Sequence, residues 1–317
     1  MDRYTLYNTA RAALCAAIAA MAATSCVKDH LEDSALIGQG AVMLLADFSA
    51  HSSDMPLPGT YQVLLDGREF NVPSHDAYLL PCSFTPMATT LIAFNEPQGM
   101  ERQGMTMRVR QLSDGSIDPM PQPLFAARAD IIIPKDDTLR LALPMRQHLY
   151  ALRFELPVTR GDAALIQQVE GVVTGVAQHF DLARQEVTGG TPASIRLSFY
   201  REEEASTHAM RRSPATTTYI GQAGLLGIDG QVQQLTLHIG YTNGTWQTIV
   251  TDIGTMMAGF GSGQSLEPLV ITGGMEAPME AGLEATISGW QVRNGEVEIR
   301  QVPHTGNREI TDGAERY

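Results

Sequence analysis

The sequence of 317 residues is poor in cysteine, tryptophan and basic side chains. Of its three cysteines, Cys15 and Cys26 lie near the N-terminus; if the segment with Cys15 is removed and Cys26 carries lipid, Cys82 is the one free thiol and forms no internal disulfide. The 35 acidic residues outnumber the 22 basic ones, which gives a net charge of -13. So acidic a chain repels nucleic acid and anionic lipid surfaces. Stability must come from hydrophobic burial, because no disulfide framework is available.

The sequence also lacks the motifs of common enzyme active sites. Its eight histidines form no His-Glu-x-x-His motif, and there is no Gly-x-Ser-x-Gly elbow. The glycine-rich stretch 259–263 lacks the lysine of a phosphate-binding loop. Asp114 and Asp118 are spaced like calcium ligands, but such loops need more oxygen ligands, so a turn is favoured. We therefore predict no enzymatic activity, no cofactor and no metal site.

Three further side chains have both a structural and a functional interpretation. Trp246 and Trp290 could form a sugar-stacking platform, because each presents a large flat ring. Their place in alternating segments favours core packing instead. Cys82 follows Leu80-Pro81 and is predicted to be a small buried hydrophobe rather than a nucleophile.

The N-terminus has the pattern of a secretory signal. Arg3 and Arg11 supply a positive start, residues 12–25 carry no charge, and the small residues Ala23-Thr24-Ser25 come last. The apolar run is too short to span a bilayer, which needs ~20 apolar residues. Residues 1–25 are therefore predicted to be a signal peptide that is removed.

Cys26 follows the predicted cleavage site directly, as in bacterial lipoproteins, where lipid is attached to this thiol. The alternatives are an ordinary signal peptide or a buried helix. Against them, the chain turns polar at once, with Val27-Lys28-Asp29-His30. Several acyl chains would hold the protein firmly, because each buried methylene adds ~0.8 kcal/mol. We expect a protein anchored to the outer membrane through Cys26.

Period-two alternation dominates the first half of the mature chain. Tyr61, Val63 and Leu65 alternate with outward positions, and Asp66-Gly67 then predicts a turn into 68–72. Segments 40–48, 90–94, 105–110, 129–133 and 139–143 also have the pattern of strands, whereas 115–123 holds three prolines and is predicted to be a loop.

The second half repeats this pattern. Strands are expected at 149–156, 171–177 and 195–199, a short helix capped by Asp162 is possible over 162–169, and residues 201–216 are predicted to be a solvated loop. Two hairpins are expected around Asn243-Gly244 and Asn294-Gly295, because Asn-Gly accepts the positive φ of a type I′ turn. The fold class is therefore all-β, with two β-sandwiches in series.

The expected organisation has five parts. They are a signal peptide (1–25), a tether (26–39), an N-terminal sandwich (40–146), a C-terminal sandwich (147–302) and a flexible tail (303–317).

The lipid-attachment pattern, the tether and the two β-domains together resemble the fimbrillin superfamily. More narrowly, the chain resembles FimB-type fimbrial anchor lipoproteins of Bacteroidetes and their relatives, most clearly at 169–177 and 287–290. Lys28-Asp29 resembles the signal that exports such lipoproteins to the cell surface. The resemblance implies transthyretin-like sandwich domains and assembly by strand addition with fimbrial subunits. The polar tail after 302 would fill a partner's groove poorly.

Two functions remain open at this point. The first is a non-enzymatic, lipid-anchored surface protein that serves as a fimbrial anchor or accessory subunit. The second is a surface lipoprotein that binds a glycan or another ligand.

The lipid on Cys26 can be tested directly. Metabolic labelling with palmitate should mark the wild-type protein, and Cys26→Ser should remove the label because the acceptor thiol is gone. Equal labelling of the two proteins would show that Cys26 is not the site of attachment.

Overall fold

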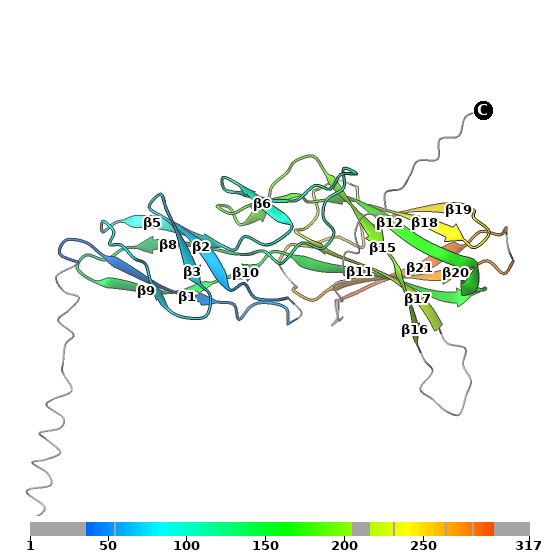
Figure 1. Cartoon of the computed structure of the whole chain (residues 1–317), viewed down its shortest axis with the longest axis horizontal. Helices are drawn as coiled ribbons and strands as arrows, with labels where there is room; N and C mark the ends of the chain where they lie inside the picture. Colours follow the sequence, from blue (N-terminus) through cyan, green and yellow to red (C-terminus); the bar gives the residue numbers. More distant parts are fainter. Residues whose placement is uncertain are drawn as a thin grey trace, which may run out of the picture. The chain divides into compact units, whose positions relative to one another are not determined.

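The computed structural model describes residues 36–53, 55–204, 216–230, 232–263, 265–280 and 282–294. Apart from one 3-10 turn, its regular elements are β-strands, as Figure 1 shows. The predicted all-β sandwich class is confirmed. The predicted signal peptide, Cys26, Lys28, Asp29 and the tail at 303–317 lie outside the described residues.

The strands of the first half are short and closely spaced. They are β1 (Ala41–Asp47), β2 (Thr60–Leu65), β3 (Arg68–Pro73), β4 (Tyr78–Leu79), β5 (Ala88–Phe94), β6 (Met100–Gln103), β7 (Thr106–Val109), β8 (Phe125–Ile132), β9 (Thr138–Pro144) and β10 (Arg146–Gln147).

The second half contains longer strands. They are β11 (Tyr150–Arg160), β12 (Ile166–Val176), β13 (His179–Asp181), β14 (Glu186–Val187), β15 (Ala193–Ser198), β16 (Tyr200–Glu204), β17 (Thr216–Leu225), β18 (Gln234–Tyr241), β19 (Trp246–Asp252), β20 (Leu269–Glu276) and β21 (Thr286–Asn294).

The chain divides into two compact units. The smaller unit comprises the residues up to Leu44 together with Leu79–Thr89 and Ile131–Leu141. Within it, Gly40 and Phe84 exchange two backbone hydrogen bonds of 2.9 and 2.8 Å. The larger unit comprises Leu45–Tyr78, Thr90–Asp130 and the chain from Ala142 onward.

Two sheets of the larger unit form its sandwich. One has the strand order β16-β17-β11-β20-β21 and the other β15-β12-β18-β19. In the first sheet β11 pairs antiparallel with β17 and parallel with β20. A parallel neighbour requires a long connection, which here is the chain that builds β12 to β19. The central strand β11 therefore has partners on both sides, and among the described residues β16 and β21 form the two edges.

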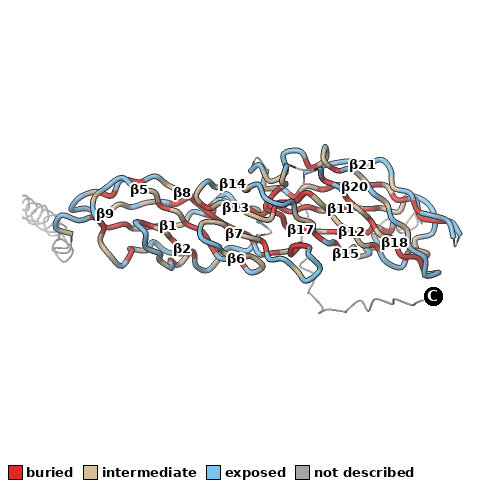
Figure 2. Tube along the Cα trace, turned by 90° about the horizontal axis from the view of Figure 1, so that it is seen from above, coloured by how far each residue is buried: buried red, intermediate tan, exposed pale blue. Residues whose placement is uncertain are grey.

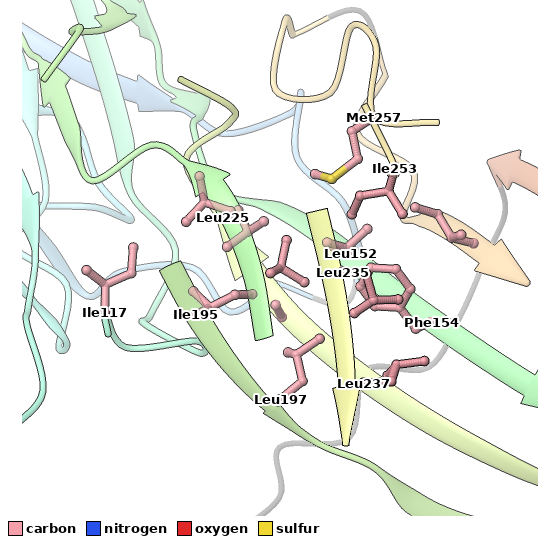
Figure 3. Close-up of a cluster of buried hydrophobic side chains, with 14 of the residues drawn as sticks. Ile117, Leu152, Phe154, Ile195, Leu197, Leu225, Leu235, Leu237, Ile253 and Met257 are labelled. Atoms are coloured by element: carbon pink, nitrogen blue, oxygen red, sulfur yellow. The ribbon is translucent and has the colours of Figure 1, made fainter. Parts of the chain in front are cut away.

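The core of the sandwich follows from the alternation along its strands. Leu152, Phe154 and Leu156 of β11 are buried, while the intervening Arg153 and Glu155 lie on the other face and form an ion pair of 2.9 Å. Leu235 and Leu237 are buried on the opposite sheet, and Figure 3 shows their side chains beside Phe154. In Figure 2 the buried stretches follow β11, β12 and β17. Each sheet thus contributes one apolar face to a shared core.

The predicted turn at Asp66-Gly67 is confirmed. Both residues have positive φ, 51° and 69°, and they join β2 to β3 in register, with Leu65 opposite Arg68. Positive φ at both central residues is the signature of a type I′ turn.

A small sheet combines segments from both sides of residue 146. Its order is β14-β13-β7-β6, and Phe180 of β13 lies opposite Met107 of β7. Both side chains are buried.

Two local predictions for the second half need correction. Instead of a helix over 162–169, the structure has one 3-10 turn at Ala163–Leu165, and Asp162 caps it by accepting a 2.9 Å hydrogen bond from the Ala164 N–H. The chain then becomes strand β12, because Val169 belongs to the sandwich core. Residues 201–204, predicted to be loop, form part of β16 and pair with β17.

His148 is a buried titratable group in the larger unit. Its ring lies 4.3 Å from the ring of Phe180, centroid to centroid, and its Nε2 lies 3.2 Å from Oε1 of Gln185. Burial lowers the pKa of His148 to about 4, although the hydrogen bond to Gln185 acts in the opposite direction. The folded protein therefore holds a neutral imidazole that the unfolded chain protonates more readily.

The core makes one prediction about stability. Phe154→Ala should lower the free energy of unfolding by about 3 to 5 kcal/mol, because it removes a fully buried ring and leaves a cavity. Val250→Ala is the matched control, since Val250 is 58% exposed and should change stability by no more than about 0.5 kcal/mol. Urea unfolding measures both; equal losses would contradict the proposed core.

His148 makes a prediction about pH. Its folded pKa lies below the unfolded value, so its contribution is complete above about pH 6.5 and is lost as the pH falls toward about 4. Between pH 7 and pH 4.5 the wild type should lose about 2 kcal/mol more unfolding free energy than His148→Gln. Parallel pH profiles of the two proteins would show that His148 is not buried in its neutral form.

Candidate functional site

Each sheet of the sandwich ends in an edge strand within the described part of the chain. β19 ends one sheet and β21 ends the other. None of the residues of β19 is buried; exposed side chains alternate with half-buried ones. An edge strand presents unpaired N–H and C=O groups on its outer side, which another strand can pair with. These edges are therefore candidate surfaces for an interaction with another chain.

Trp246 begins β19 and is 58% exposed. Its indole lies against Gly240 of β18, where an added Cβ would come within 3.1 Å of the ring carbons. The predicted core position of Trp246 is thus wrong. A glycine opposite the ring leaves room for it to lie flat on the neighbouring strand while its other face stays open to solvent.

Trp290 on β21 is held differently. Its ring lies over Gly273 of β20, where a Cβ would be 2.8 Å from it, and it is partly buried against the core. Core packing is confirmed for this residue. The two tryptophans differ in exposure because only Trp290 packs against the core.

The hairpin that carries Trp246 is close to the prediction. Tyr241 accepts a 2.9 Å hydrogen bond from the Gly244 N–H, and Gly244 has a φ of 82° while Asn243 is not among the residues of positive φ. The turn is therefore of type I followed by a left-handed glycine, not type I′. Asn243 accepts hydrogen bonds from the backbone and hydroxyl of Thr245, at 3.0 and 2.7 Å.

The segment before β21 is tied to this hairpin. The Ala285 N–H donates to the Tyr241 hydroxyl and to Gln247 Oε1, at 2.9 and 2.8 Å, and Gln247 Nε2 donates to the Ala285 carbonyl at 2.8 Å. Burial raises the pKa of Tyr241, so its hydroxyl stays protonated. The same segment exposes Met279 and Leu283, which no sequence pattern distinguished from core residues.

The other candidate residues from the sequence form no reactive group. Asp114 accepts from the backbone and hydroxyl of Ser116, at 3.0 and 2.6 Å, and pairs with Arg196, whereas Asp118 pairs with Arg110. The serine hydrogen bonds lower the pKa of Asp114. The two hydrogen bonds from Ser116 to Asp114 confirm the turn interpretation. Cys82 is only partly buried, contrary to the expectation of a buried hydrophobe.

Metal ligands and membrane-spanning helices can be assessed for the described part of the chain. There, no three of the histidine, cysteine, aspartate and glutamate side chains gather closely enough to hold a metal ion. The same part of the chain contains no helix that is long and apolar enough to cross a bilayer. The candidate interaction sites in this part of the chain are therefore the strand edges and the tryptophan rings that lie against glycines.

Comparisons with known proteins give a fold. No protein-family model and no curated protein matches the chain. Among solved structures, a candidate adhesin from Bacteroides thetaiotaomicron aligns with a TM-score of 0.55 at 12% identity, over 82% of this chain and 99% of its own. Another candidate adhesin, from Bacteroides ovatus, has a TM-score of 0.52 at 11% identity, over 81% of this chain and 97% of its own. The chain shares the fold of these proteins.

A fimbrial anchor protein, Mfa2 from Porphyromonas gingivalis, also aligns. It covers 81% of this chain and 98% of its own at 9% identity, but the TM-score of 0.48 carries no weight. The likeness to proteins of this kind does not single out the FimB-type anchors.

Proposed function

We propose that the protein is a lipid-anchored cell-surface protein that serves in adhesion, as a fimbrial anchor or accessory subunit. The observation that carries the proposal is the shared fold, which extends over nearly the whole length of two candidate adhesins. The fold itself does not specify a role, since one architecture hosts many functions. The N-terminal pattern that ends at Cys26 adds the expected attachment to the outer membrane.

The sheet edges support assembly by strand addition. β19 pairs with β18 along Gln234–Gly240 and has no neighbouring strand on its other side within the described residues. Its exposed Val250 and Trp246 would lie in such an interface. Backbone pairing supplies affinity in this mode of recognition, and side chains on alternate positions supply specificity.

The proposal excludes enzymatic activity and requires partners outside the cell. Fimbrial subunits are the expected partners, and the outer membrane is reached through the lipid on Cys26. Nucleic acid is not an expected partner, because the acidic chain repels phosphate backbones, and the proposed role requires no cofactor.

Deletion of the gene, with complementation, tests this function. Electron microscopy of the deletion strain should show fimbriae that are released or lengthened, because their attachment or termination has failed. Wild-type protein should restore the normal appearance, and Cys26→Ser produced at the same level should not. Unchanged fimbriae in the deletion strain would contradict the proposal, as would full rescue by Cys26→Ser for the anchoring role.

A further inference from the structure

A pocket of about 500 Å³ lies in the larger unit, apart from the edges described above. Its walls come from four separate segments: residues 56–62, Asn71, residues 95–97 and residues 122–123. The volume lies within the range of about 300 to 1,000 Å³ that is usual for small-molecule sites.

The walls of the pocket are held in place by side-chain and backbone hydrogen bonds. Asn95 is buried; its Nδ2 donates to the Pro123 carbonyl at 2.9 Å and its Oδ1 accepts from the Phe125 N–H at 2.6 Å. The Gln122 N–H donates to the Gln98 carbonyl at 2.9 Å. Pro97 and Pro123 are buried and have fixed φ. The pocket is therefore formed before any ligand arrives, which lowers the entropic cost of binding.

The lining of the pocket includes a pair of carboxamides. Gln62 of β2 and Asn71 of β3 lie directly opposite each other in the antiparallel pair, so their side chains share one face. Neither makes a side-chain hydrogen bond to another described residue. Each carboxamide offers two donors and one acceptor group. Side by side, they match the alternating donor and acceptor character of neighbouring hydroxyl groups on a sugar ring.

The charge of the pocket favours an uncharged ligand. Glu96 is the one acidic or basic side chain among the lining residues. It already forms an ion pair with Arg102, whose Nε lies 3.0 Å from Oε1 of Glu96. None of the lining residues therefore offers a cation to a phosphate, sulfate or carboxylate. Leu57 and the proline rings supply apolar surface of the kind that C–H groups of a sugar contact.

We propose that this pocket binds a neutral mono- or disaccharide. The proposal goes beyond the fimbrial role, because the pocket and the strand edges use different residues. The saccharide site and the fimbrial role can therefore each be true without the other. A saccharide site on a surface protein would attach the cell to a glycan. The carboxamides of Gln62 and Asn71 recognise the hydroxyl groups, and Asn95 is a positioning residue that holds the Pro123 wall.

Isothermal titration calorimetry on the purified full-length protein tests this site. The probes are maltose, cellobiose and lactose, with sialyllactose as a charged comparator and a proline-rich peptide as a polymer of another class. At least one neutral disaccharide should bind with a dissociation constant of about 1 mM or tighter. The double variant Gln62→Ala/Asn71→Ala should weaken it by about ten-fold or more, because two hydrogen-bonding groups are lost.

Controls separate the pocket from other surfaces. Gln291→Ala removes an exposed carboxamide from β21 and should leave the affinity unchanged. Trp246→Ala should also leave the affinity unchanged. A loss of affinity confined to this variant would place the sugar on Trp246 and would contradict binding in the pocket. Thermal unfolding of the double variant should match the wild type, so that weak binding is not a failure to fold.

Three results would overturn the proposal. They are no heat of binding for any neutral disaccharide, equal affinity in the wild type and the double variant, and preferential binding of sialyllactose or of the proline-rich peptide.

Discussion

Hydrophobic burial between two facing sheets is the interaction on which the rest of the larger unit depends. Cys82 forms no disulfide within the described part of the chain, so no covalent cross-link contributes there. Phe154 and its neighbours on β11 are buried against the apolar face of the opposite sheet. Because the side chains of a strand alternate, the same burial that orients Phe154 inward places Arg153 and Glu155 outward. Packing thus determines which side chains are left to face the surroundings.

The same constraint explains the candidate surfaces. A sandwich with two open sheets must end in edge strands, and β19 and β21 are two of them. Glycines on the strands next to these edges make room for the two tryptophan rings: Gly240 of β18 lies against Trp246, and Gly273 of β20 lies against Trp290. The pocket proposed to bind a saccharide lies elsewhere, where buried Asn95 holds a proline-containing loop beside the end of β5. Both proposed interactions thus rest on strand edges and loops that the packed sheets hold in place.

Local patterns in the sequence predicted local structure well. Alternation located β2, β11 and β18, a continuous apolar run located β5, and Asp66-Gly67 located the turn between β2 and β3. The errors lie where tertiary contacts outweigh local preference. Residues 166–169 join β12 instead of a helix, because Val169 packs in the core.

Contacts between distant segments were not predictable from one sequence. The pairing of Met107 with Phe180 joins strands more than 70 residues apart, and no local pattern records it. The pocket has the same character, since Gln62, Asn71, Asn95 and Gln122 meet only in the folded chain. Trp246 and Trp290 look alike in the sequence, and only the structure shows that one is exposed and the other packed.

The central claim is that this sandwich works outside the cell as part of an adhesion assembly. Immunogold electron microscopy of intact, unpermeabilised cells tests it most directly. Gold particles should mark the cell surface, concentrated where fimbriae meet the outer membrane. Labelling that appears only after the cells are permeabilised, with none at the surface, would contradict the account.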